Sequence, residues 1–200
     1  DFEKYLRAVK INSPNIYKIV SLEYYVLKMT LNLDFEESNE KLKILFAQNA
    51  DFNKINQSPV WYFFTISWMN AYLYRINLHS TSHEDIYTKS QELIPMIVFR
   101  LEKKLYKAIS QWLPLANFTN YADYAFLAGE TEWIKNFILE YSGELKSNEK
   151  DDAVNYAWGV YYYSIGEYVE SLSSFLKVQE TFPTLFVNVK RFMMLCHYQL

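Results

Sequence analysis

The chain has 200 residues, half of them hydrophobic, and a formal net charge of -3, with acidic and basic residues mixed along its length. This length fits one domain or a short run of repeats that fold together. No basic block of the kind that neutralises a row of phosphates is present, so we expect no nucleic-acid partner. Only four Gly and five Pro are present, which favours long helices over a fold with many turns.

Cysteine content and the termini bear on the compartment. The single cysteine, Cys196, excludes an intramolecular disulfide and a cysteine-based metal site, and it is compatible with a reducing compartment. No signal peptide opens the chain, so we expect a cytoplasmic protein. The chain begins without Met and stops inside a helical run at 186–200, so we expect it to be a piece of a longer protein.

Apolar residues recur at helical spacing over most of the first 112 residues, and this pattern predicts an all-α fold. The predicted helices cover 15–32, 35–50, 59–78, 83–94 and 96–112. Pro14 and Pro59 are start signals, and the polar stretch 78–82 is an expected loop. Pro95 is expected to interrupt or kink its helix because proline lacks a backbone donor, and Pro114 marks a further break. The short polar connections favour antiparallel packing of neighbouring helices.

One stretch is long enough to require a membrane test. Residues 55–74 carry no charge and include Trp61, Phe63 and Trp68, over a length that could span a bilayer. Polar residues such as Thr65 and Asn70 interrupt the run, and polar groups are costly in hydrocarbon. We therefore expect no membrane insertion, and a helix buried by its neighbours.

Residues 152–183 have the spacing of a tightly packed helical hairpin. Gly159 is a small residue that lets a second helix approach closely, and Ser171 is the small residue facing it. Gly166 permits a tight turn between the two helices. Phe175 and Val178 are expected to cover the core face of the second helix. Pro183 is expected to end that helix and begin the next one.

This pattern resembles the tetratricopeptide-repeat (TPR) family, whose 34-residue helix–turn–helix has small, aromatic and proline residues at fixed positions. The matching residues fall in register without a gap: Gly159, Tyr162, Ser171, Phe175 and Pro183. The chain departs from the family at Asn155, where Trp is frequent, and at Trp158, where Leu is usual. Ser171 and Val178 both replace the usual Ala. The resemblance implies an α-solenoid of stacked antiparallel helical hairpins.

Weaker copies flank this hairpin. In residues 118–141, Gly129 corresponds to Gly166, Ala122 to the small residue of the first helix, and Ala125 stands where an aromatic residue is expected. A third first helix follows Pro183. We therefore expect TPR-like repeats over 115–200. Residues 1–114 are expected to be degenerate repeats or a helical cap, the whole chain forming one continuous superhelical domain.

The resemblance also implies a binding surface, because first helices line the concave face of such arrays. The residues at its groove-facing positions are Thr119, Asp123, Phe126, Tyr156, Val160, Tyr163, Lys190, Met194 and His197. Relatives that grip a terminal carboxylate use Lys, Asn and Arg there, and this chain offers Lys190 alone. The groove would suit an apolar or helical peptide. The alternative is that some of these residues belong to the core.

Residue pairs that could support catalysis or metal binding have simpler explanations. His79 and His83 are separated by Ser80, Thr81 and Ser82, a pattern typical of a loop and helix cap rather than of a metal site. Cys196 and His197 are neighbours, so on a helix their side chains diverge by about 100° and cannot form a nucleophile–base pair. We expect no catalysis, no metal and no cofactor.

The sequence thus predicts a protein–protein interaction module or scaffold that binds a protein or peptide. The alternative is a helical sensor or regulatory domain of a larger enzyme or transcription regulator, because fold resemblance is a limited guide to function. Self-association through exposed repeat ends is a further expectation, since repeat arrays without polar caps tend to pair. The flanking sequence of the gene would distinguish the two classes.

Overall fold

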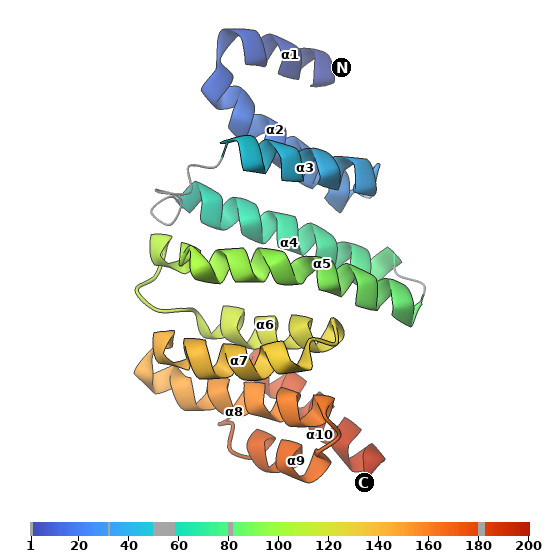
Figure 1. Cartoon of the computed structure of the whole chain (residues 1–200), viewed down its shortest axis with the longest axis vertical. Coiled ribbons are helices and arrows are strands. Elements are labelled where there is room, and N and C mark those ends of the chain that lie inside the picture. Colours follow the sequence, from blue (N-terminus) through green and yellow to red (C-terminus); the bar gives the residue numbers. More distant parts are fainter. Residues whose placement is uncertain (1, 32, 50–58, 80–81, 180–182) are drawn as a thin grey trace. The chain divides into compact units, whose positions relative to one another are not determined.

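The structure is a computed structural model that describes residues 2–31, 33–49, 59–79, 82–179 and 183–200. Over these residues the chain forms ten α-helices and no β-strand (Figure 1). The α-helices are α1 (Phe2–Asn12), α2 (Pro14–Thr30), α3 (Phe35–Asn49), α4 (Pro59–His79), α5 (His83–Glu102), α6 (Leu115–Leu127), α7 (Thr131–Tyr141), α8 (Ser147–Ser164), α9 (Tyr168–Phe175) and α10 (Pro183–Gln199). Two 3-10 helices, η2 (Leu105–Ala108) and η3 (Ser142–Glu144), lie between them. The all-α expectation is confirmed for this part of the chain.

The chain divides into two compact units. The first contains residues 1–82 and 99–109, and the second contains residues 83–98 and 110–200. Helix α5 contributes its residues 83–98 to the second unit and its last residues to the first.

The first unit is held together by α2, which packs on α1, α3 and α4, and by the packing of η2 on α4. Helix α4 contains residues 59–74 of the uncharged stretch, and residues 55–58 lie outside the described residues. Its Phe64 and Trp68 rings pack with Phe46 of α3, and the Trp68 indole donates to Asn39 Oδ1 at 3.1 Å. Among the described residues no helix has the length and apolar character needed to cross a membrane.

A buried arginine links the last residues of α5 to α4 within the first unit. The Arg100 guanidinium donates to the Tyr62 carbonyl oxygen at 3.1 Å and to the Thr65 hydroxyl, and it lies 4.9 Å from the centre of the Tyr62 ring. These partners satisfy a cation that is almost fully buried. The polar residue Thr65, which argued against a membrane span, is thus part of an internal hydrogen-bond network.

In the second unit, two hairpins are closed by the same type of turn. Gly129 joins α6 to α7 with φ +69°, and Gly166 joins α8 to α9 with φ +81°. At each turn the glycine N–H bonds to a carbonyl three residues earlier, and the next N–H bonds to one five residues earlier, which is the Schellman arrangement. Only glycine takes this left-handed conformation without a steric cost. The predicted turns at Gly129 and Gly166 are confirmed.

The hairpins pack on one another in a consistent order (Figure 1). Helix α6 packs on α7 and on α8, and α7 also packs on α8. Helix α8 packs on α9, and α9 packs on α10. Helix α7 therefore contacts both α6 and α8, and α9 contacts both α8 and α10.

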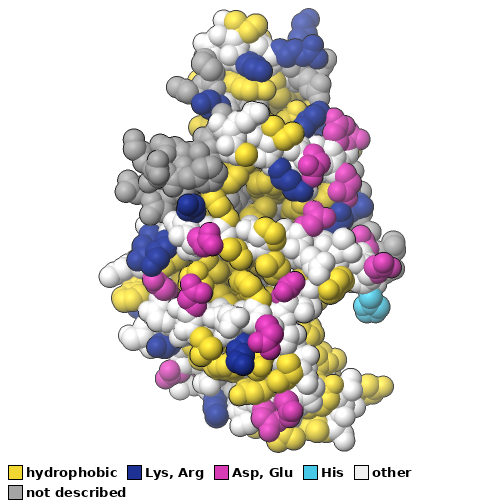
Figure 2. Space-filling model, viewed as in Figure 1, with side chains coloured by type: hydrophobic (Ala, Val, Ile, Leu, Met, Phe, Trp, Pro, Cys, Tyr) yellow, Lys and Arg dark blue, Asp and Glu magenta, His cyan; other side chains and the backbone are white. Residues whose placement is uncertain are grey.

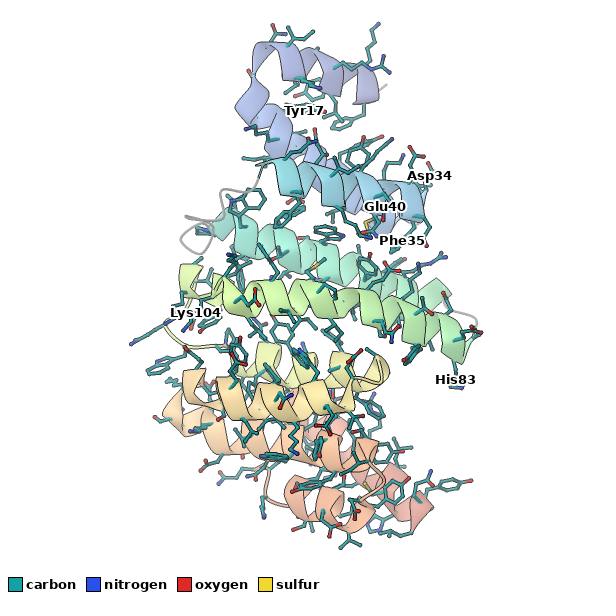
Figure 3. The ribbon with its side chains drawn as sticks, in the orientation of Figure 1. Tyr17, Asp34, Phe35, Glu40, His83 and Lys104 are labelled. Atoms are coloured by element: carbon teal, nitrogen blue, oxygen red, sulfur yellow. The ribbon has the colours of Figure 1, made fainter. Side chains whose placement is uncertain are left out.

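Helix α5 differs from its prediction in both its continuity and its end. It runs through Pro95 without interruption, because Pro95 lies on the exposed side while Leu93 and Ile97 are fully buried. The carbonyl that loses its partner therefore faces water. The helix ends at Glu102, not near residue 112, because Lys104 takes a left-handed conformation with φ +47° (labelled in Figure 3).

Helix α9 is shorter than expected. It ends at Phe175, which is buried as predicted, so Val178 lies beyond the helix and is only half-buried. The expectation that Val178 covers the helical core face is wrong. Its segment is held instead by the Gln179 N–H, which donates to the Asp152 carboxylate of α8 at 2.8 Å.

Candidate functional site

The first helices of the two hairpins are joined by a partly buried polar pair. The Tyr156 hydroxyl of α8 lies 2.8 and 3.0 Å from the two carboxylate oxygens of Asp123 of α6. Burial raises the pKa of Asp123 to about 6, although the hydrogen bond from Tyr156 and the positive charge of Arg191 oppose the shift. Burial and the neighbouring Asp123 also raise the pKa of Tyr156. The pair therefore links α6 to α8 through hydrogen bonds in a partly buried setting.

Next to this pair lies a cluster of aromatic rings from three helices. Phe126 of α6 and Tyr163 of α8 have ring centroids 5.6 Å apart, and Phe192 of α10 lies 5.6 Å from the first and 5.4 Å from the second. Phe192 is buried, whereas Phe126 and Tyr163 are half-buried and reach solvent. We call these two adjoining rings the Phe126–Tyr163 face.

The structure separates the residues expected to line a groove into buried and accessible ones. Those on α6 and α8 lie together, but Tyr156 and Val160 are 0% exposed and Thr119 is buried. A partner that approaches this side can therefore touch only the half-buried residues of this set, namely Asp123, Phe126 and Tyr163. The buried Tyr156 supports these rings from the interior, since its own ring lies 6.3 Å from that of Phe192.

The expected groove residues on α10 lie apart from that cluster. Met194 is 73% exposed, and His197 is exposed as well. Lys190 lies 4.9 Å above the Phe186 ring and borders a hollow of about 130 Å³ between α9 and α10. The inward side of α10 carries a different set of residues: Leu185, Val189, Phe192 and Cys196.

Phe192 is thus a residue of this site that the repeat register did not indicate. Its spacing from Leu185 and Val189, at seven and three residues, is a helical stripe and was available in the sequence. A second stripe, which includes Val187 and Met194, has the same character. The pattern alone does not distinguish the inner stripe from the outer one.

A second open surface lies between α8 and α9, where the sequence analysis placed no site. It is a hollow of about 410 Å³, which we call the α8–α9 hollow. Its lining residues are Asn155, Trp158 and Tyr162 of α8, and Val169, Glu170, Ser173, Ser174 and Lys177. Figure 2 shows hydrophobic side chains over α8, with acidic side chains beside them over α9. The aromatic signal was present in the sequence, since Trp158 and Tyr162 are four residues apart on one helical face.

The pairs considered for chemistry do not form reactive sites. Cys196 is fully buried and donates to the Ser171 hydroxyl at 3.3 Å, while the neighbouring His197 is exposed. His83 lies at the exposed start of α5 (labelled in Figure 3), and the side chain of His79 and residues 80–81 lie outside the described residues. In the described part of the chain no three His, Cys, Asp or Glu side chains gather in a way that could hold a metal.

No family model, no curated protein and no solved structure matches this chain. Its function must therefore be argued from the geometry of the described residues. Within the described residues of the second unit, the Phe126–Tyr163 face and the α8–α9 hollow each present a pair of half-buried aromatic side chains in mutual contact.

Proposed function

We propose that this chain is a protein–protein interaction module of TPR-like helical hairpins, which binds a peptide or protein and performs no catalysis. The observation that carries the proposal is the Phe126–Tyr163 face. Two aromatic side chains on the first helices of successive hairpins lie 5.6 Å apart, half-buried, above a rigid support. Aromatic side chains held in this way supply large contact area with little loss of conformational entropy, and they are enriched at binding hot spots.

The TPR-like arrangement is supported by three features of the second unit. The two hairpins have identical turn geometry at Gly129 and Gly166. The first helices α6 and α8 are in direct contact, joined by the Asp123–Tyr156 hydrogen bonds. Within the second hairpin, the helices cross at the small residues Gly159 and Ser171, as in the family's pattern, and the Ser171 hydroxyl donates to the Gly159 carbonyl at 2.8 Å.

The partner of this face is expected to be apolar at its centre. The accessible parts of the face are an aromatic ring and a phenol, and the neighbouring Asp123 is engaged by Tyr156. An amphipathic helix that places one or two apolar side chains between the rings matches this surface.

Adjacent tyrosines supply a matched test of the face. Tyr163 and Tyr162 are neighbours on α8 and both are half-buried, but Tyr163 contacts Phe126 and Phe192 whereas Tyr162 lines the α8–α9 hollow. Partners captured by the wild-type chain are compared by quantitative mass spectrometry with those captured by Tyr163→Ala and Tyr162→Ala. The proposal predicts a partner that Tyr163→Ala loses and Tyr162→Ala keeps.

Equal retention by all three proteins would exclude the Phe126–Tyr163 face as the binding site. Thermal unfolding must accompany the experiment, because a variant that unfolds loses every partner. Phe126→Ala is the second variant of the same face and should lose the same partner as Tyr163→Ala.

A further inference from the structure

The α8–α9 hollow has a defined length and a defined polarity. The two helices are antiparallel, so Tyr162 at the end of α8 lies opposite Glu170 near the start of α9, and Asn155 lies opposite Lys177. Seven residues separate Asn155 from Tyr162 on α8, which corresponds to roughly 10 Å along the axis of that helix. Its volume of about 410 Å³ lies within the range of known small-ligand pockets.

The central wall of the hollow is aromatic. The Trp158 and Tyr162 rings stack with centroids 5.8 Å apart and an interplanar angle of 29°. Neither ring is fully exposed, so each is held by its neighbours and offers the remaining surface to the hollow. Such a pair is a platform on which flat or ring-shaped groups stack.

Nearly all the polar side chains of the hollow can donate a hydrogen bond, and Trp158 and Lys177 can only donate. Six side chains can donate: Asn155, Trp158, Tyr162, Ser173, Ser174 and Lys177. Glu170 is the only carboxylate among the lining residues. Within the described part of the chain, none of these seven side chains makes a hydrogen bond or an ion pair. They are therefore free to bond to a ligand, and a ligand rich in acceptors and poor in donors complements them best.

We propose that the α8–α9 hollow binds a proline-rich segment of a partner in the polyproline II conformation, with a basic residue at the Glu170 end. Each proline presents a carbonyl acceptor and no N–H donor, which matches the donor-rich wall. Its ring packs on aromatic side chains, as in other aromatic-lined grooves that take such segments. At a rise of 3.1 Å per residue, roughly three residues fill the length of the hollow.

Charge sets the expected orientation of the segment. The Glu170 carboxylate, exposed at one end, attracts a basic side chain of the ligand, whereas Lys177 at the other end repels it. An extended β-strand is a poorer occupant, because the helices α8 and α9 offer no free edge of backbone donors and acceptors.

The test uses fluorescein-labelled peptides and the full 200-residue chain. Two probes, Arg-(Pro)6 and (Pro)6-Arg, have capped termini, so that the arginine is their only charge apart from the anionic dye, which all probes share. An Arg-(Gly-Ser)3 peptide has the same length and charge without the proline rings. Binding is measured by fluorescence anisotropy at low and at physiological salt.

We expect at least one proline probe to bind saturably, with a dissociation constant on the order of 0.1 mM, as is typical of a small site. Trp158→Ala should weaken binding about tenfold, because it removes the central platform. Glu170→Gln should weaken it about threefold and reduce its salt dependence. Tyr163→Ala, on the other surface, should leave it unchanged within about twofold.

A second variant covers the possibility that Trp158→Ala fails to fold. Ser173 is exposed and lines the hollow, so Ser173→Tyr fills the space without removing a core side chain. It should abolish binding while the melting temperature stays near that of the wild type. Saturable binding that survives Ser173→Tyr would place the peptide elsewhere and overturn the proposal.

Two further results would also overturn it. One is that neither proline probe binds saturably to the wild-type chain when the protein reaches several millimolar. The other is that the Gly-Ser peptide binds with the same affinity as the proline probes. This inference does not depend on the Phe126–Tyr163 face. Tyr163→Ala tests that face, whereas Trp158→Ala and Ser173→Tyr test the hollow, so the two proposals can fail separately.

Discussion

Gly159 and Phe175 approach so closely that a β-carbon at residue 159 would lie 2.6 Å from Cε1 of the Phe175 ring. No real β-carbon tolerates that distance, so the crossing of α8 and α9 requires a glycine at this position. The Phe175 ring is almost fully buried and stacks on Phe192 at 5.4 Å, which leaves it little room to move. The short distance between α8 and α9 at their crossing therefore depends on the absence of a side chain at Gly159.

The first prediction is that Gly159→Ala destabilises the protein. Overpacking against the Phe175 ring costs about 1–3 kcal/mol, and the better helix propensity of alanine returns at most ~1 kcal/mol. A net loss of about 1–2 kcal/mol in the free energy of unfolding is expected from urea denaturation. Gly143→Ala is the matched control, because a β-carbon at residue 143 meets no atom within 4 Å. An equal effect of the two substitutions would contradict the crossing geometry.

Ser171 faces the same crossing from α9, and its replacement by alanine should lower the stability only slightly. Its hydroxyl donates to the Gly159 carbonyl at 2.8 Å and accepts from the Cys196 thiol at 3.3 Å. Ser171→Ala removes these bonds but leaves no large group unsatisfied, so we expect a loss of about 1 kcal/mol or less. Ser171→Val should cost clearly more, because its extra methyl groups enter the space against Gly159. Thermal unfolding of both variants measures the difference.

The sequence predicted the second unit best where one residue type is sterically required. The turns at Gly129 and Gly166 and the crossing at Gly159 depend on glycine alone, so they could be read without knowledge of the rest of the fold. The end of α5 could not be predicted, because a lysine does not indicate the left-handed conformation that Lys104 takes. The helix through Pro95 was missed because burial of its inner face outweighs the loss of one backbone hydrogen bond.

The candidate site was predicted only in part, for a related reason. Asp123, Phe126 and Tyr163 lie on the adjoining helices α6 and α8, but whether a helical face is core or surface depends on its neighbours. Tyr156 is buried beneath the neighbouring helices, which no local pattern reveals. Helix α10 carries two apolar stripes, and only packing selects the one with Phe192 as the inner stripe.

The two turn glycines provide a prediction about backbone strain. Gly166 has φ +81° with open space around it, so Gly166→Ala should cost about 1 kcal/mol from the left-handed conformation alone. Gly129→Ala has the same backbone cost, and its β-carbon would also lie 2.8 Å from the Tyr87 ring. We expect a loss of about 1–2 kcal/mol there, because the half-exposed Tyr87 ring can shift. In a Tyr87→Ala background, Gly129→Ala and Gly166→Ala should lower the free energy of unfolding by the same amount. A difference that persists there would contradict this explanation.

The last prediction concerns the pH dependence that Asp123 confers on folding. Its pKa is raised from 3.8 to about 6 in the folded protein, so between these values the folded state binds more protons than the unfolded state. Stability from this group is therefore full at low pH and falls as the pH rises through this window. The loss amounts to roughly 2–3 kcal/mol at neutral pH, as an upper value.

Asp123→Asn isolates this effect, because asparagine cannot ionise and still offers an oxygen to the Tyr156 hydroxyl. The variant should match the wild type near pH 4 and exceed its stability by up to about 2 kcal/mol at pH 8, measured by urea denaturation at each pH. A difference that does not change with pH would mean that the carboxylate is not desolvated in the folded state. A variant less stable than the wild type at pH 8 would mean that the charged form is favoured there, with Arg191 outweighing burial. The predicted result implies that the chain retains, next to the Phe126–Tyr163 face, a carboxylate that weakens its own fold at neutral pH.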